Sequence, residues 1–253
     1  MAMNDHLYLT LPSDSSVKYY PNNTIARFVT KLPETIRLHG HYEMALAEII
    51  YPHTWYNLNN DDERYWVSFN YPNVTKKVPI PSGYYDDGHA LLDVLDMEHM
   101  QEFGVRFSYN RTSSRFNLTV RPPGQQTFEM SKDLQTYMGL EIRGCDKSYS
   151  IRANTDFDAN RGLNLMYVYC DVASHSIVGD TKTPLLRVCN ITGKHRDFVR
   201  HTYNQPHYVP VGRHEFDTIE IAIYNELGKP MPFQYGKSVV TIHFRRRWTI
   251  TSI

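Results

Sequence analysis

The feature that most constrains the fold is a β-type alternation that recurs along the whole chain. Short stretches of alternating apolar and polar residues are separated by clusters of Pro, Gly and Asn, a pattern typical of a β-sandwich or barrel. In residues 116–121, for example, Phe116, Leu118 and Val120 point to one face of a half-buried strand. Helical periodicity is scarce, so we expect a mostly β protein.

This alternation predicts roughly ten strands, enough for two facing sheets plus extra strands. They cover residues 25–32, 42–51, 65–70, 105–109, 116–121, 163–171, 185–191, 198–203, 218–225 and 238–246. The polar segment 110–114 has the length of a hairpin connection. All-β sandwiches often reach 253 residues as one unit, and no repeat or long linker divides this chain. We therefore expect one domain, residues 1–253.

Two segments depart from the strand pattern. Residues 86–100 place Leu91, Leu92, Val94 and Leu95 on an apolar stripe with acidic residues between them, which indicates an amphipathic helix. Residues 131–139 predict a shorter helix, with Ser131 as its N-cap and Gly139 at its end. We expect both helices to lie over a sheet edge or opening.

The charge balance and the cysteines exclude several classes of protein. Lys plus Arg and Asp plus Glu both number 27, so no basic footprint for wholesale phosphate binding is present. The three cysteines, Cys145, Cys170 and Cys189, lack CxxC spacing and are expected to be small buried residues in a reducing compartment. The first ten residues have no secretory pattern, and no apolar run is long enough to span a bilayer. We expect a soluble protein that is not secreted.

The sequence contains no recognisable catalytic or cofactor site. Twelve histidines invite a metal hypothesis, but His39 and His41 flank a glycine and are equally compatible with a loop, and HExxH is absent. The regular spacing of His195, His201 and His207, six residues apart, matches no metal-ligand pattern. No GxSxG, GxGxxG or P-loop sequence occurs. Cys170 lies among strand formers and is expected to be packed rather than reactive. We predict no catalytic, cofactor-binding or metal-binding residues.

A run of three arginines ends the last predicted strand. Arg245 and Arg247 would point to one face and Arg246 to the other. The run could contact nucleic acid, but a solvated strand end or ion pairs with carboxylates across a subunit boundary are the favoured interpretations.

Several blocks of the sequence together resemble a known family. They are LYLTLPSDSS at 7–16, KYYPN at 18–22, FVTKLP at 28–33, YEMALAEIIYPHTWYN at 42–57, PSGYY at 81–85, YVYCD at 167–171, VGDT at 178–181, PLLRV at 184–188 and VTIHFRR at 240–246. In order and spacing they resemble the single jelly-roll, penton-type minor capsid proteins of Polinton/Maverick-like and adintovirus-like double-stranded DNA elements. The blocks span nearly the whole chain.

This resemblance implies an architectural protein. The expected fold is all-β: a single jelly roll with two facing antiparallel sheets, about eight core strands and one or two short helices. Residues 1–23 would be a candidate flexible or inter-subunit arm. The protein would form homopentamers at the five-fold vertices of an icosahedral particle, beside a double jelly-roll major capsid protein. It would be located in the virion and assembled in the host cell, in the nucleus.

Two segments are candidate subunit contacts, and two other functions stay open. Residues 57–63 and 146–161 are long polar connections, which often carry recognition on a rigid sandwich. A carbohydrate- or receptor-binding β-sandwich is the main alternative, based on surface-prone aromatics: Trp55, Tyr56, Trp66, Tyr84 and Tyr85. The histidine count leaves a metal-dependent enzyme on a cupin-like barrel as a third hypothesis.

Overall fold

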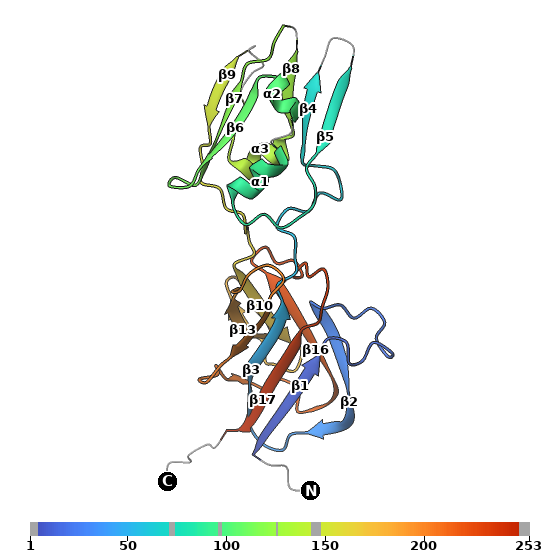
Figure 1. Cartoon of the computed structure of the whole chain (residues 1–253). Coiled ribbons are helices and arrows are strands. Elements are labelled where there is room, and N and C mark those ends of the chain that lie inside the picture. Colours follow the sequence, from blue (N-terminus) through green and yellow to red (C-terminus); the bar gives the residue numbers. More distant parts are fainter. Residues whose placement is uncertain (1–4, 71–73, 96–97, 125, 143–147, 248–253) are drawn as a thin grey trace. The chain divides into compact units, whose positions relative to one another are not determined.

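The chain folds into two compact units (Figure 1). The computed structural model describes residues 5–70, 74–95, 98–124, 126–142 and 148–247. The first unit, here called the sandwich unit, combines Met1–Trp55 with Gly162–Ile253, and the second, the inserted unit, is the continuous segment Tyr56–Arg161. The sequence led us to expect one body over residues 1–253. The difference arises because the segment between two sandwich strands is long enough to bury a core of its own.

The sandwich unit consists of two antiparallel sheets. Sheet 1 has the order β1-β17-β3-β14, with the short β15 also paired to β3, and sheet 2 has the order β13-β10-β16-β2. The strands of sheet 1 are β1 (His6–Pro12), β17 (Val239–Arg246), β3 (Tyr42–Pro52), β14 (Phe198–Thr202) and β15 (Val209–Pro210). Those of sheet 2 are β13 (Leu185–Asn190), β10 (Leu165–Cys170), β16 (Glu215–Asn225) and β2 (Arg27–Arg37). A separate hairpin joins β11 (Ser176–Val178) to β12 (Thr181–Thr183).

The strand pairs are nested in the way that defines a jelly roll. Strand β1 pairs with β17, β2 with β16, β3 with β14, and β10 with β13, so early strands pair with late ones from the outside of the sequence inwards. Each pair is antiparallel, and consecutive members of the nest alternate between the two sheets. The predicted jelly roll with about eight core strands is therefore confirmed.

The core of the sandwich unit lies between its two sheets. Alternate residues of β17, namely Val240, Ile242 and Phe244, are fully buried, as strand geometry requires of an inward face. The ring of Phe244 lies 5.9 Å from that of Phe216 on β16, so the two sheets make direct contact. Burying such side chains contributes about 1.5–3 kcal/mol each.

The beginning of the described chain is a strand of sheet 1. Residues 6–12, which fall in the segment 1–23 that we considered as an arm, pair with β17 from His6 opposite Arg245 to Pro12 opposite Val239. Leu11 is buried and holds this strand against the core. This part of the segment therefore belongs to the fold of its own subunit.

The described residues of the inserted unit form two three-stranded sheets and three helices. One sheet has the order β5-β4-β8 and the other β6-β7-β9. The strands are β4 (Trp66–Asn70), β5 (Thr75–Pro79), β6 (Val105–Asn110), β7 (Arg115–Val120), β8 (Thr127–Met130) and β9 (Tyr149–Arg152). The helices are α1 (Gly88–Leu95), α2 (Glu98–Glu102) and α3 (Lys132–Met138). Its own core includes Phe69, Leu91, Phe103, Phe116 and Leu134.

The helices and the hairpin predicted in this unit from the sequence correspond to elements of the structure. In α3, the side chain of Ser131 accepts a hydrogen bond from the backbone N–H of Leu134, and Gly139 ends the helix in the left-handed conformation. The predicted helix 86–100 corresponds to α1 and α2, with residues 96–97 outside the described part. The hairpin β6–β7 pairs Asn110 with Arg115 as expected.

All ten predicted strands overlap strands of the structure. None of the described helices has the length and apolar character needed to cross a bilayer.

Candidate interaction surfaces

The outer face of sheet 2 carries a cluster of tyrosines. On β10, Met166, Val168 and Cys170 point into the core, so Tyr167 and Tyr169 point outward and are half-buried. Tyr167 pairs across the sheet with Tyr224 of β16 on one side and with Val188 of β13 on the other. We call this surface the tyrosine face and define it by Tyr167, Tyr169, Val188, Ala222 and Tyr224.

A shallow pocket of about 440 Å³ opens on the tyrosine face. The rings of Tyr169 and Tyr224 meet edge to face, with centroids 5.7 Å apart, and form an aromatic corner. Asp171 and Glu220 also line the pocket, together with Thr183 and Pro184. The pocket therefore combines apolar ring surface with fixed hydrogen-bond acceptors.

Arginines hold both carboxylates of this pocket. Asp171 lies 3.2 Å from Arg213 and accepts a hydrogen bond from the backbone N–H of Glu220, while the Glu220 carboxylate lies 2.6 Å from Arg27. Burial raises the pKa of the Asp171 carboxyl, an effect that the Glu220 N–H and the Arg213 guanidinium partly oppose. Because each carboxylate has a cationic partner, the charges at the pocket balance.

The outer face of sheet 1 is polar and also balanced in charge. Glu48 of β3 accepts a hydrogen bond of 2.7 Å from Arg200 of β14, and Thr10 of β1 lies 3.3 Å from Thr241 of β17 through their hydroxyls. Two large apolar side chains project from this face, because Phe198 is 64% exposed and Tyr8 is 60% exposed.

Two histidines and two tyrosines form an aromatic cluster at one end of sheet 1. The Nδ1 atom of His6 lies 3.0 Å from Nε2 of His243, and the Tyr208 hydroxyl lies 2.7 Å from the other ring nitrogen of His243. Tyr8 stacks on His243 at 4.2 Å. Burial lowers the pKa of His243, and the nearby His6 and Arg245 lower it further.

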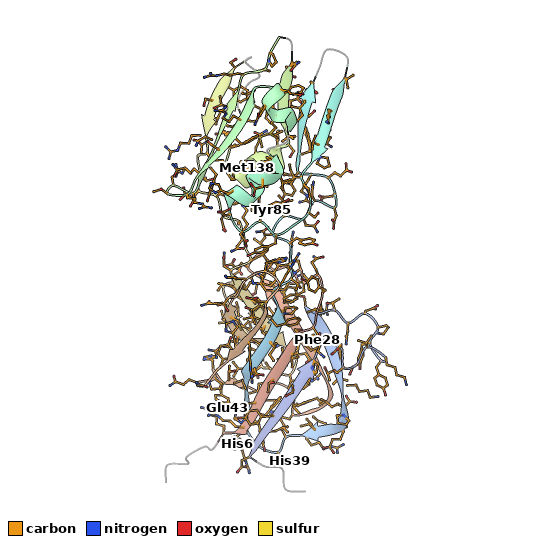
Figure 2. The ribbon with its side chains drawn as sticks, in the orientation of Figure 1. His6, Phe28, His39, Glu43, Tyr85 and Met138 are labelled. Carbon is orange, nitrogen blue, oxygen red and sulfur yellow. The ribbon has the colours of Figure 1, made fainter. Side chains whose placement is uncertain are left out.

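The arginine run that ends β17 makes contacts within its own chain. Arg245 forms a 2.6 Å ion pair with Glu43 of β3 and lies 3.4 Å over the ring of Tyr208. Arg246 lies 3.9 Å from Asp5. Arg245 therefore pairs with a carboxylate of its own chain, and ion pairing of this run across a subunit boundary stays a prediction. Figure 2 shows Glu43 and His6 at one end of the sandwich unit.

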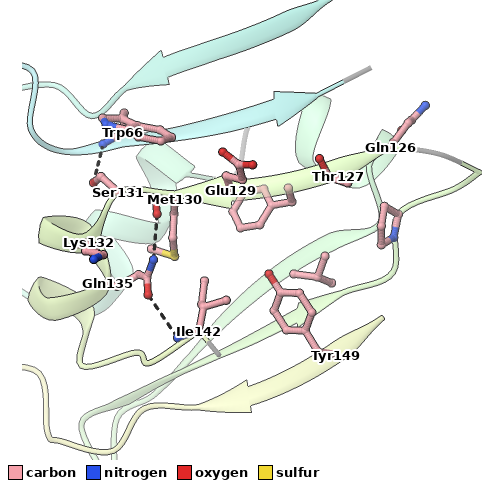
Figure 3. Close-up of a pocket in the computed structure, with 13 residues that line it drawn as sticks. Trp66, Gln126, Thr127, Glu129, Met130, Ser131, Lys132, Gln135, Ile142 and Tyr149 are labelled. Carbon is pink, nitrogen blue, oxygen red and sulfur yellow. Dashed lines mark hydrogen bonds between the residues drawn. The ribbon is translucent and has the colours of Figure 1, made fainter. Parts of the chain in front are cut away.

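A second pocket, of about 360 Å³, lies inside the inserted unit along strand β8 (Figure 3). Its walls include all four residues of β8 together with Val120 and Tyr149 from the other sheet. Gln135 of α3 closes one end, because its side chain donates to the carbonyl of Met130 and accepts from the N–H of Ile142. The pocket follows the edge strand of one small sheet and the inner face of the other.

The histidines singled out from the sequence lie apart from one another. His39 and His41 are exposed on the loop between β2 and β3, as the loop interpretation predicts. His201 stacks on Tyr51, His195 lies beside His53, and His207 is on an exposed segment. Among the described residues, no three His, Cys, Asp or Glu side chains are grouped so as to hold a metal ion.

The two described cysteines are packed residues, as predicted. Cys170 is fully buried, and burial raises the pKa of its thiol to about 12. Burial also raises the pKa of Cys189. Both thiols therefore stay protonated at neutral pH, which removes their nucleophilicity. Cys145 lies outside the described residues.

The aromatic residues that suggested carbohydrate binding are not a surface group. Trp55 is fully buried and Tyr85 nearly so, and Tyr85 belongs to the core of the inserted unit. Trp66 and Tyr84 are half-buried, which leaves Tyr56 as the exposed member of the set at 37%. The aromatic surface is instead the tyrosine face. Its residues lie in segments predicted as strands, but the sequence does not show which side of the sheet they face.

The two loops proposed as subunit contacts are ordered by internal hydrogen bonds or pairing. In segment 57–63, the Asn60 side chain is buried and donates to the carbonyls of Tyr65 and Ile80. Segment 146–161 contains β9 and the buried Phe157, while residues 146–147 lie outside the described part. Their role as contacts stays a prediction.

Comparison with known proteins finds similarity at the level of the structure. No protein-family model and no curated protein sequence matches the chain. Among solved structures, the mavirus penton protein is similar over 95% of this chain and 99% of its own chain, with a TM-score of 0.51 and 12% sequence identity. At this identity the similarity establishes the fold, and its coverage shows that it extends over both units.

Proposed function

We propose that this chain is a structural, non-enzymatic minor capsid protein of penton type that forms the five-fold vertices of an icosahedral particle. The observation that carries the proposal is the structural similarity to the mavirus penton protein, which covers 95% of this chain and includes the jelly roll. The sequence blocks that resemble Polinton/Maverick-like and adintovirus-like elements support it independently. The partners would be four further copies of this chain and a double jelly-roll major capsid protein. The protein would reside in the virion after assembly in the host nucleus.

The first test is the mass of the purified protein by light scattering over a range of concentration and salt. Five chains of 29.6 kDa would give a particle of about 148 kDa, and electron microscopy would show a five-fold ring. The measurement is repeated with the double jelly-roll major capsid protein encoded by the same element. A protein that stays monomeric alone and with that partner would contradict the proposal.

A carbohydrate-binding function is the second candidate, and the pocket on the tyrosine face favours it. Tyr169 and Tyr224 offer ring surface to the apolar side of a sugar, and the charge-balanced carboxylates of Asp171 and Glu220 could accept hydrogen bonds from its hydroxyls. A glycan array probed with the purified protein tests it. Selective binding that Tyr169→Ala abolishes would support this function, and an array without signal would contradict it.

A further inference from the structure

We infer that, in the ring that the proposed function requires, the tyrosine face of one copy packs against the outer face of sheet 1 of the next copy. This inference rests on the proposed function and names the two surfaces that would form the subunit boundary. In a ring of identical subunits every contact joins two different surfaces of the same protein. A sandwich has two such different surfaces, the outer faces of its two sheets (Figure 1). The ring closes if the contact between them turns each copy by one fifth of a full rotation relative to the next.

The tyrosine face has the chemistry of a covered surface rather than a solvated one. An antiparallel sheet that faces water usually alternates apolar inward residues with polar outward ones. On β10 the outward residues are Leu165, Tyr167 and Tyr169, with no charged side chain among them. Tyr is enriched at the centre of protein interfaces, where its ring is buried and its hydroxyl still finds a partner.

Exposed apolar side chains occur on the tyrosine face and in segments that adjoin its pocket. Val188 of the face is 41% exposed. Leu227 is 66% exposed next to Gly228, which lines the pocket, and Ile177 is 75% exposed on the hairpin β11–β12. That hairpin leads into β13 through Thr183 and Pro184, which line the same pocket. With strands about 4.8 Å apart and about 3.3 Å per residue, the four strands of sheet 2 present a flat area on the order of 450 Å². The exposed apolar side chains named above would bring the contact area of sheet 2 toward the roughly 800 Å² per partner of a stable interface.

The outer face of sheet 1 offers the matching properties. Phe198 and Tyr8 project from it and could enter the pocket or the spaces between the tyrosines of the neighbouring copy. Its charged residues are paired within the sheet, Arg200 with Glu48 and Arg245 with Glu43. On the tyrosine face, Arg27 and Arg213 pair with Glu220 and Asp171. These ion pairs could be buried without isolating a charge. Lys31, exposed on the edge strand β2 and 5.0 Å from the centroid of the Tyr19 ring, would have to stay at the solvated margin of the contact.

Charge introduced on the tyrosine face tests the inference. We expect the double variant Tyr167→Arg, Tyr224→Arg to fold, because both side chains point away from the core, but to raise the dissociation constant of the ring roughly a hundredfold or more. Val74→Arg, at a 62% exposed position of the inserted unit, is the matched control and should assemble as the unchanged protein does. Circular dichroism and light scattering report folding and mass.

A mixing experiment identifies the opposite surface. The double variant Tyr8→Asp, Phe198→Asp places charges on the outer face of sheet 1 and should therefore not form the ring. Its tyrosine face stays intact. Mixed one to one, the two double variants should form a single heterodimer of about 59 kDa, because each retains one functional face and neither can extend the chain.

The outcomes separate this inference from the proposed function. A ring that the Tyr167→Arg, Tyr224→Arg variant still forms would overturn the inference and leave the vertex function standing. Loss of the ring in that variant but not in the sheet 1 variant would overturn the pairing of the two faces. Glycan bound to the pocket of the assembled ring would also overturn it. An unchanged protein that never assembles, with or without the major capsid protein, would overturn both.

Discussion

The two units of this chain bury their cores in different ways. The sandwich unit packs two extended sheets against each other, and its strand pairs join residues far apart in sequence, as in His6 opposite Arg245. The inserted unit is one continuous segment in which two smaller sheets and three helices enclose a separate core. The inserted unit can therefore complete all its contacts locally, whereas the sandwich unit needs both ends of the described chain.

This difference predicts that the two units unfold separately. A segment with its own core and local contacts opens as its own cooperative unit, while long-range pairing makes the sandwich unit cooperative across its whole sequence. The following predictions test that separation, beginning with the largest effect.

Matched phenylalanine deletions should damage one unit at a time. Phe116 in the inserted unit and Phe244 in the sandwich unit are both fully buried. Phe116→Ala and Phe244→Ala should each cost about 3–5 kcal/mol of unfolding free energy. Hydrogen exchange measured by mass spectrometry should show lost protection within residues 56–161 for the first variant and outside them for the second. Equal loss in both units for either variant would show that they unfold as one body.

A glycine in the inserted unit should be nearly as sensitive. Gly104 has a φ of +61°, and an added Cβ atom would lie 2.1 Å from the carbonyl oxygen of Arg121. The backbone N–H of Arg121 donates to the carbonyl of Gly104 at 2.9 Å, so moving the two segments apart to make room would break this hydrogen bond. Gly104→Ala should cost about 2–4 kcal/mol from strain and overpacking, measured by urea unfolding.

Gly124→Ala is the control for this substitution. Gly124 has a similar φ of +65°, but nothing lies within 4 Å of an added Cβ atom. Only the backbone strain of about 1–2 kcal/mol should remain. Equal costs at the two positions would show that the contact with Arg121 has no energetic effect.

The cap of α3 should make a smaller contribution, confined to the inserted unit. Ser131→Ala removes the acceptor for the Leu134 N–H and should cost about 1 kcal/mol. Lys132→Ala, at an exposed position of the same helix, should stay within about 0.5 kcal/mol of the unchanged protein. Thermal unfolding compares the two, and a Ser131→Ala variant as stable as Lys132→Ala would refute the capping role.

The smallest effect should be a pH dependence in the sandwich unit. Burial, His6 and Arg245 lower the pKa of His243 in the folded protein, so the folded state binds a proton less readily than the unfolded chain. The contribution of His243 to stability is then fully present above the pKa of the unfolded chain, about 6.5. This contribution is lost as the pH falls below that pKa toward the lower pKa of the folded protein. Burial also lowers the pKa of His53 and His201, which act in the same direction.

Between pH 7 and pH 5, the melting temperature of the His243→Gln variant should therefore fall less than that of the unchanged protein. His207→Gln, at an exposed position, serves as the control and should keep the full slope. An unchanged slope in His243→Gln would rule out this histidine as a source of the pH dependence.

Strands of the core could be predicted from the sequence, but the division into units could not. The sequence pattern located β3, β16 and β17 because most of their inward residues are apolar. The entry to the inserted unit, between Trp55 and Tyr56, has no Pro, Gly or Ser to mark a boundary. Short polar strands such as β5 and β12 have little alternation, because few of their side chains are buried. Strand β1 is absent from the ten predicted strands, because residues 1–23 were assigned to a candidate arm, although Leu7, Leu9 and Leu11 alternate with other residues as in a strand.

The candidate surface was hidden for a different reason. On β10 both faces are hydrophobic, with Met166 and Val168 inward and Tyr167 and Tyr169 outward, so alternation could not distinguish them. Conversely, Trp55 and Tyr85 look like surface aromatics in sequence but are enclosed by elements distant along the chain. The exposure of an aromatic ring is decided by tertiary packing, whereas strand propensity is local.

The position of β17 in sheet 1 has a consequence for biosynthesis. This strand lies between β1 and β3, yet a ribosome makes it more than two hundred residues after β1. Until residues 239–246 have emerged, β1 has no partner in its sheet, although the inserted unit can already have folded. A nascent chain cut short before β17 would lack the centre of that sheet and could not present its finished outer surface. Synthesis of β17 would thereby decide when sheet 1 can form.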